Sequence, residues 1–353
     1  MNENLNVFQG SDSIRDYLDP GKGAYLPLVE LPASLNPFLA DGVRISAKLM
    51  TFSGLHNVKA IPAYNMILAR HERGELDGVT DLIENSSGNT VSSLAIAARL
   101  FGIENMHAIV PDEVSWNKLQ MLLFYGIRPI VNQEPRQPEE DDPRSGVYKA
   151  RAKGQEAGWL NPGQYNNPDN PAAHERWIGR QIWEQTAGNI TVFAAGMGTT
   201  GTIIGNSKYL KSQNEAIQVV GVRRAPGNYV PGPRTADLLT LIGFDWQPHV
   251  DTLQDVTTAE AYQKSMELSR SGLIVGPSSG LSLVGLLHYL QQRQTDNTLD
   301  QIRNSVGEVN CTFICPDTPF PYFDEYFKYL DAANFPAIEN EEFLLNKPQV
   351  AGG

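Results

Sequence analysis

Short apolar segments alternate along the chain with longer segments in which apolar residues recur every three or four positions. The short segments are rich in β-branched residues, as strands are, and they cover 43–49, 81–85, 107–111, 128–132, 190–196, 218–222 and 311–316. The longer segments have helical spacing and cover 63–76, 90–102, 114–126 and 173–186. This alternation predicts an α/β fold of two doubly wound domains with mainly parallel sheets. Apolar residues on both alternations of the strands indicate sheets covered on both faces.

Two polar segments divide this pattern. Residues 132–146 are charged and rich in proline, and residues 161–175 are rich in asparagine and proline, so both are predicted to be surface loops. A chain of 353 residues exceeds what one hydrophobic core usually organises. We therefore expect a larger domain of residues 1–48 and 160–338, a smaller domain of residues 49–159, and a loosely held tail at 339–353.

Charge and cysteine content narrow the classes of partner. The formal net charge is −12, which argues against nucleic acid or an anionic membrane as the main partner. The two cysteines, Cys311 and Cys315, share one face of a predicted strand, and no second Cys/His pair completes a metal site. We expect packed core thiols, with a redox pair or a disulfide as the alternative. The N-terminus resembles no secretory signal, so a cytoplasmic protein is expected.

A glycine- and threonine-rich turn follows the predicted strand 190–196 and runs into a helical segment. Glycines let the backbone approach an anion closely, and the N–H groups of the following helix point at it. The same glycines satisfy the G-x-G-x-x-G pattern of a dinucleotide site, and the next strand ends at Arg223 and Arg224, where an NADP enzyme can place a cation. By itself the turn leaves open a phosphate monoester, a dinucleotide or a structural turn; it consists of Gly196, Met197, Gly198, Thr199, Thr200, Gly201 and Thr202.

Three other positions place polar groups or an amine before a helical segment. The run SSGNT (86–90) suits a carboxylate and suits a well-capped helix equally. The neighbours of Lys59 are apolar or neutral, which favours a lowered amine pKa and imine formation, although an isolated lysine is far more often solvated. The turn GPSSG (276–280) fits a helix cap as well as a site.

Taken together, these motifs resemble the cysteine synthase and cystathionine β-synthase family, fold type II of the pyridoxal phosphate enzymes. The resemblance covers roughly residues 24 to 327 and disfavours NADP, because in this family the glycine-rich turn holds the cofactor phosphate. It rests on six motifs in order, which are NVK (57–59), SSGNT (86–90), NPGQYNNPDNP (161–171), GMGTTGT (196–202), GPSSG (276–280) and CPDT (315–318).

This resemblance implies roles for individual residues. Lys59 would carry pyridoxal 5′-phosphate as a Schiff base, Asn89 would contact the ring hydroxyl, and Ser278 would face the pyridine nitrogen. The larger domain would bind the cofactor phosphate, through Gly198, Thr199, Thr200, Gly201 and Thr202. The smaller domain would carry the loop for the substrate carboxylate, which is bound by Ser86, Ser87, Gly88 and Thr90 together with Gln164. The resemblance also implies a homodimer.

Departures from the family pattern lie around the second substrate. Lys59 is followed by Ala60-Ile61, and the asparagine loop is bounded by Asn85-Ser86 and Thr90-Val91, where the family usually has other residues. Residues 231–251 replace a glycine-rich active-site loop with leucines and a threonine. The cofactor motifs are therefore kept while the surroundings of the second substrate differ.

Three arginines lie in or beside this altered segment, namely Arg223, Arg224 and Arg234. Arginine in a cleft is suited to bidentate capture of a carboxylate or phosphate, so we hypothesise that one substrate carries an extra negative charge and that Arg234 binds it. The alternative is that these side chains pair with surface acids.

The expected function is β-elimination and β-replacement on serine or an O-activated serine, through an α-aminoacrylate intermediate. The nucleophile can be a group other than sulfide, because the second-substrate segment is altered. A catalytically silent binding or regulatory protein is the alternative, and an intact Lys59 weighs against it because such a protein has little chemical use for this amine.

Overall fold

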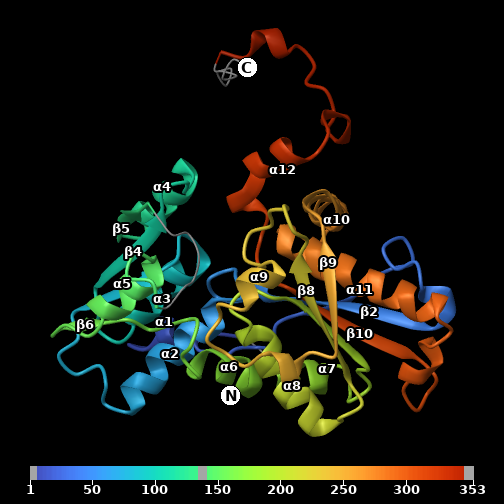
Figure 1. The fold of residues 1–353 in the computed structure, drawn as a ribbon, viewed down its shortest axis with the longest axis horizontal. Helices are drawn as coiled ribbons and strands as arrows, with labels where there is room; N and C mark the ends of the chain where they lie inside the picture. Colours follow the sequence, from blue (N-terminus) through green and yellow to red (C-terminus); the bar gives the residue numbers. More distant parts are fainter. Residues whose placement is uncertain (1–5, 134–140, 346–353) are drawn as a thin grey trace.

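The computed structural model describes residues 6–133 and 141–345 and arranges their strands in two sheets, one in each of two α/β domains (Figure 1). The larger sheet has the order β1-β2-β10-β7-β8-β9, and only β1 is antiparallel to its neighbour. Its strands are β1 (Leu28–Glu30), β2 (Val43–Leu49), β7 (Val192–Gly196), β8 (Gln218–Arg224), β9 (Thr252–Val256) and β10 (Val309–Cys315). The smaller sheet is parallel, in the order β5-β4-β3-β6. Its strands are β3 (Asp81–Asn85), β4 (Asn105–Pro111), β5 (Ile127–Asn132) and β6 (Trp159–Leu160).

Helices cover both faces of each sheet. In the larger domain, α11 packs against four strands on one face, while α8 and the segment from η3 to α7 lie on the other. In the smaller domain, α2 and α3 cover one face of the sheet and α5 the other. The α-helices are α1 (Ser13–Leu18), α2 (Ala60–Glu72), α3 (Asn89–Arg99), α4 (Trp116–Phe124), α5 (Gly146–Lys153), α6 (Asp169–Ala173), α7 (Arg180–Gln185), α8 (Gly201–Gln213), α9 (Ala236–Leu239), α10 (Thr258–Arg270), α11 (Pro277–Thr295) and α12 (Phe323–Tyr329).

Short helical turns complete the chain. Seven of those that the structure describes are 3₁₀ turns, and η3 is a π-helical turn. Their bounds are η1 (Leu39–Asp41), η2 (Met50–Phe52), η3 (His174–Gly179), η4 (Gln247–His249), η5 (Leu299–Ile302), η6 (Phe320–Tyr322), η7 (Ala332–Asn334) and η8 (Glu341–Phe343).

The alternation of apolar residues along β10 shows why the larger sheet is covered on both faces. Cys311, Phe313 and Cys315 join the cluster beneath α11, whereas Ile314 joins the cluster beneath α8. All four side chains are buried. The prediction of two α/β domains with mainly parallel, double-faced sheets is confirmed. The prediction of packed core thiols is also confirmed, since Cys311 and Cys315 are free and buried.

Each predicted strand and helix is present; the strands predicted at 43–49 and 81–85 have those bounds, and the other elements have shifted ends. The predicted helix 173–186 is in fact three segments, because α6, the π-helical turn η3 and α7 follow one another. The prediction of a loop over 161–175 is wrong in its C-terminal part, where α6 begins. There the Asn167 Oδ1 atom accepts the N–H of Asp169, the first residue of the helix, at 2.9 Å.

Other predictions concern a loop, the C-terminal tail and the domain boundaries. Within the predicted loop 132–146, residues 134–140 lie outside the described residues, and α5 begins at Gly146. In the predicted tail, residues 339–345 are all exposed and extend away from both domains (Figure 1), and residues 346–353 lie outside the described residues. The domain boundaries at 48/49 and 159/160 stay a prediction; β6 spans the second of them.

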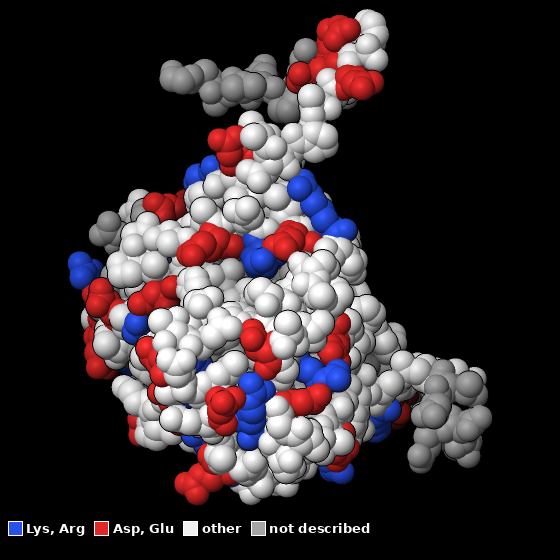
Figure 2. Space-filling view, turned by 90° about the vertical axis from the view of Figure 1, so that its right-hand side faces the viewer, with Lys and Arg blue, Asp and Glu red and all other residues white. Residues whose placement is uncertain are grey.

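Charge is mixed on the surface. In Figure 2, lysine and arginine lie interspersed among aspartate and glutamate on the side of the molecule that the view presents. None of the helices within the described ranges is long and apolar enough to cross a membrane. Among the described residues, no three His, Cys, Asp or Glu side chains are placed to hold a metal ion.

Candidate active site

A cavity of about 400 Å³ lies where the two domains meet. Its wall is formed at the carboxyl ends of β3, β7 and β10 and at the N-termini of the helices that follow them, which is where parallel α/β sheets bind ligands. Every predicted site residue except Gly201 lines it: Lys59, Ser86, Ser87, Gly88, Asn89, Thr90, Gln164, Gly198, Thr199, Thr200, Thr202, Arg234 and Ser278.

Lys59 lies directly before α2. Its N–H donates to Asn57 Oδ1 at 2.9 Å, and the Val58 N–H donates to the Pro316 carbonyl at 2.6 Å, so the backbone is tied to the segment that follows β10. The side chain is partly exposed to the cavity, where Nζ lies 3.5 Å from Thr199 Oγ1. Burial, aided by the nearby Arg234 cation, lowers the pKa of Lys59 to about 8. An amine with this pKa is partly neutral near pH 7 and can attack an aldehyde carbon.

The turn before α8 presents hydroxyls and free N–H groups to the cavity. Thr200 adopts the left-handed conformation (φ 67°) directly before the first residue of this 13-residue helix. Thr202 Oγ1 lies 3.2 Å from Nε2 of His174. Burial, followed by the influence of the Lys59 cation, lowers the pKa of His174 to about 3, so its imidazole is neutral. Hydroxyls at a helix N-terminus form a donor set suited to a phosphate.

Gly201 is the one predicted phosphate residue that lies behind the cavity. A Cβ at this position would lie 2.2 Å from Asn170 Oδ1. Asn170 in turn donates to Thr199 Oγ1 at 3.3 Å and to the Gln164 carbonyl at 2.7 Å. Packing against Asn170 therefore leaves no room for a side chain at this position.

The loop between β3 and α3 is joined to Gln164. Thr90 Oγ1 donates to Gln164 Oε1 at 2.7 Å, and Gln164 Nε2 donates to the Asn85 carbonyl at 3.1 Å. Buried Glu84 supports both segments from behind, because it accepts the N–H groups of Asn85, Gly163 and Gln164 at 2.8, 3.0 and 3.1 Å. Burial raises the pKa of Glu84 to about 7. Sequence reasoning missed Glu84, although a glutamate inside the apolar strand 81–85 was a signal.

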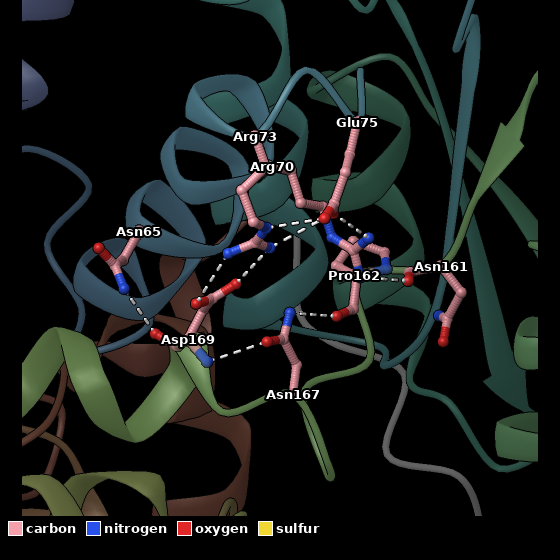
Figure 3. A network of polar contacts seen from close by, with 8 residues as sticks. All are labelled: Asn65, Arg70, Arg73, Glu75, Asn161, Pro162, Asn167 and Asp169. Carbon is pink, nitrogen blue, oxygen red and sulfur yellow. Dashed lines mark hydrogen bonds and ion pairs between the residues drawn. The ribbon is translucent and has the colours of Figure 1, made fainter. Parts of the chain in front are cut away.

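Side chains of α2 and of the residues directly after it also contact the segment 161–169, which contains Gln164 (Figure 3). The Arg73 guanidinium binds Asp169 at 2.9 Å and Glu75 at 2.8 Å, and Asn65 Nδ2 donates to the Asp169 carbonyl at 2.8 Å. On the loop itself, Asn167 Nδ2 donates to the Pro162 carbonyl at 2.8 Å. Lys59 and the segment that contains Gln164 are thus connected through α2.

Asp317 is a cavity residue to which the sequence analysis gave no role, although it belongs to the CPDT motif. It accepts Asn89 Nδ2 at 2.7 Å and the Tyr322 hydroxyl at 2.6 Å on the same Oδ2 atom. Its Oδ1 atom is buried without a partner. Burial raises the pKa of Asp317 to about 6, so the carboxylate is ionised at neutral pH. Asn89 keeps a second amide N–H for a ligand.

The three arginines separate into two kinds. Arg224 and Arg234 line the cavity, but Arg223 does not. Arg223 pairs with Asp255 on the neighbouring strand, with two N–O distances of 2.8 Å. Successive side chains of a strand point to opposite faces, so Arg223 and Arg224 cannot both face the cavity. The alternative of pairing with a surface acid therefore describes Arg223.

The cavity fits pyridoxal 5′-phosphate. It offers an amine with a lowered pKa, a hydroxyl-lined helix N-terminus for a phosphate, and the Ser278 side chain at the start of α11.

Comparisons with known proteins agree with this fit. Residues 24–299 match the family model described as "Pyridoxal-phosphate dependent enzyme". Cysteine synthase B of Salmonella typhimurium is 34% identical over 262 residues, which are 74% of this chain and 84% of that protein. The O-acetylserine dependent cystathionine beta-synthase of Bacillus subtilis is 28% identical over 293 residues, with 81% and 90% covered. A hydrogen sulfide-producing enzyme from Fusobacterium nucleatum shares the fold, with a TM-score of 0.73 at 22% identity over 90% of this chain and 99% of that one.

The chain is therefore a pyridoxal phosphate-dependent enzyme of fold type II. More narrowly, it belongs to the cysteine synthase and cystathionine β-synthase family, and pyridoxal 5′-phosphate is its cofactor. This assignment decides against the dinucleotide alternative for the glycine-rich turn and against a catalytically silent binding protein.

Proposed function

We propose that this enzyme catalyses β-elimination and β-replacement on serine or an O-activated serine, with its cofactor attached to Lys59. One observation carries the proposal: a single cavity brings the Lys59 amine together with the N-termini of α8 and α3. Each N-terminus favours an anion, so the pair fits the cofactor phosphate and the substrate carboxylate.

We assign the cofactor-binding roles from the family pattern and from the cavity lining. Asn89 contacts the ring hydroxyl through its remaining amide N–H, and Ser278 faces the pyridine nitrogen. A hydroxyl partner, unlike a carboxylate, does not hold the pyridine protonated, which suits expulsion of a β-substituent. The phosphate-binding turn comprises Gly198, Thr199, Thr200 and Thr202, with Gly201 supporting it from behind through Asn170.

The substrate carboxylate is assigned to the start of α3. The Thr90 hydroxyl and the Gln164 amide, which already contact each other, are joined there by the hydroxyls and N–H groups of Ser86, Ser87 and Gly88. Because Glu84 and the contacts of Arg73 fix these segments, the substrate is held in one orientation relative to Lys59.

The chemistry divides between cofactor and protein. Pyridoxal 5′-phosphate, when bound, supplies the electron sink for the substrate α-carbon. Lys59 removes the α-proton as general base and later returns a proton to the same carbon. The leaving group departs from the β-carbon with the bonding electron pair, and the nucleophile supplies the pair for the new bond there and gives up its proton.

Borohydride reduction followed by peptide mass spectrometry tests the attachment. The expected label is a reduced pyridoxyl group on Lys59, with none on Lys48, a second buried lysine whose pKa is lowered to about 7 by burial, and none on the cavity residue Lys118. The Lys59→Ala variant should keep its fold by circular dichroism, but it should lose both the label and turnover. A label on another lysine, or turnover by the variant, would refute the assignment.

We further propose a cytoplasmic homodimer, by resemblance to the family. By the same resemblance, each subunit would contain its own active site. Sedimentation equilibrium at micromolar concentration should give twice the mass of one chain; a monomer would contradict the proposal.

A further inference from the structure

Two arginines from different segments meet in the cavity wall. Arg224 is the last residue of β8, and Arg234 lies in the following segment, two residues before α9. Their backbones are joined, because the Arg224 N–H donates to the Arg234 carbonyl at 3.2 Å. Both side chains are half-buried and line the cavity that contains Lys59.

Neither guanidinium has an acidic partner among the described residues. Arg234 donates to the Tyr165 hydroxyl at 2.9 Å and lies over that ring, and Arg224 lies over the ring of Tyr229. No aspartate or glutamate of the described segments lies within 4.0 Å of either cation. The Nε atoms of both arginines are buried without an acceptor. Both side chains therefore keep donors available.

This arrangement is unfavourable without a ligand. Burial, and then the neighbouring Arg234 cation, lower the pKa of Arg224, as expected for like charges held together. The chain has 40 acidic against 28 basic residues, so acidic partners are plentiful elsewhere, as the Arg223–Asp255 pair shows. An oxyanion would offset both cations and accept their free N–H groups in the bidentate geometry that guanidinium favours.

The position of the pair indicates which part of a substrate carries this anion. Arg234 is close enough to Lys59 to contribute to its lowered pKa, so an anion bound here lies near the reacting carbons. The α-carboxylate has its own site at the start of α3, lined by Ser86 to Thr90 and Gln164. The remaining group near Lys59 is the one exchanged at the β-carbon.

We propose that Arg224 and Arg234 form a subsite for a carboxylate or phosphate on the group exchanged at the β-carbon, carried by the leaving group or by the nucleophile. This inference rests on the proposed β-replacement and names the substrate class that the site prefers. It adds Arg224 as a specificity-determining residue, and both arginines would bind the same anionic group.

The first test measures binding without turnover. The holoenzyme is reduced with borohydride, which fills the phosphate turn and fixes the cofactor, and inorganic phosphate is titrated into it by calorimetry. Arg224→Gln and Arg234→Gln should each weaken phosphate binding by about 10- to 100-fold, the usual loss for a charge-assisted hydrogen bond. Arg223→Gln is the matched control and should bind phosphate as the wild type does. Arg224→Lys, which keeps the charge without the bidentate geometry, should fall between.

The second test identifies which partner carries the anion, using pairs of anionic and neutral probes. O-phospho-L-serine is compared with O-acetyl-L-serine as the first substrate, and mercaptoacetate with 2-mercaptoethanol as the nucleophile. A loss of kcat/KM in Arg224→Gln confined to O-phospho-L-serine assigns the anion to the leaving group. A loss confined to mercaptoacetate assigns it to the nucleophile, and losses with both anionic probes support a subsite shared by the two.

The outcomes separate this inference from the proposed function. If borohydride fails to fix the cofactor on Lys59, the proposed function itself is wrong. The proposed subsite is wrong if Lys59 is labelled but the Arg224 and Arg234 variants bind phosphate as well as Arg223→Gln does. It is also wrong if these variants lose activity equally with charged and neutral probes. In both cases the proposal of β-replacement stands. Unchanged circular dichroism and melting temperature show that each variant is folded.

Discussion

The pH dependence of cofactor attachment follows directly from the environment of Lys59. Its pKa is lowered from 10.5 to about 8, first by burial and then by Arg234, while Asp317 acts in the opposite direction. Only the neutral amine attacks the cofactor aldehyde. At pH 7 about 9% of an amine with pKa 8 is neutral, against about 0.03% at the ordinary value, a gain of roughly 300-fold in reactive amine.

The assay follows the visible absorbance of apoenzyme mixed with pyridoxal 5′-phosphate in a stopped-flow instrument, between about pH 6 and pH 10. The attachment rate should rise about tenfold per pH unit below pH 7 and level off above the midpoint near 8, because the neutral fraction then saturates. Free lysine derivatives measured in parallel correct for titration of the cofactor itself.

Two substitutions should move this midpoint in opposite directions. Arg234→Gln removes a cation that lowers the Lys59 pKa, so the midpoint should rise; Asp317→Asn removes the anion that raises it, so the midpoint should fall. Arg223→Gln, paired with Asp255 outside the cavity, should leave the midpoint unchanged. A wild-type midpoint near 10.5, or shifts of the same sign in Arg234→Gln and Asp317→Asn, would refute the reasoning.

Two further predictions concern the supports behind the site. Glu84 has a folded-state pKa of about 7, raised from 4.5 by burial, so its contribution to the free energy of unfolding should fall by about 3 kcal/mol between about pH 4.5 and pH 7, and Glu84→Gln should remove this contribution and flatten the pH dependence in urea titrations. An equal slope in both proteins would contradict this. Gly201→Val should displace Asn170 and reduce cofactor retention on dialysis, whereas Gly23→Ala, whose added Cβ meets only ordinary contacts at 3.8 Å or more, should retain the cofactor. Equal retention would show that Asn170 does not support the turn.

The sequence predicted the fold class and most of the cavity for a local reason. In a parallel α/β sheet, each strand leads directly into a turn and a helix N-terminus, so a short motif contains both the ligand-binding groups and the signal for their position. SSGNT and GMGTTGT are of this kind, and all of their residues except Met197 and Gly201 line one cavity. Glu84 escaped prediction because its function depends on Gly163 and Gln164, which are distant in sequence.

The arginines show where local patterns stop being informative. Arg223 and Arg224 are adjacent in sequence and chemically identical, yet the pairing of β8 with β9 places Arg223 opposite Asp255 and leaves Arg224 facing the cavity beside Arg234. Which cation is neutralised is thus decided by strand register, a property of the whole sheet. The family motifs specify the cofactor chemistry because they are local. In the proposed subsite, preference for the exchanged group depends instead on the cations that the assembled sheets leave without an acidic partner in the cavity wall, which among the described residues include Arg224 and Arg234.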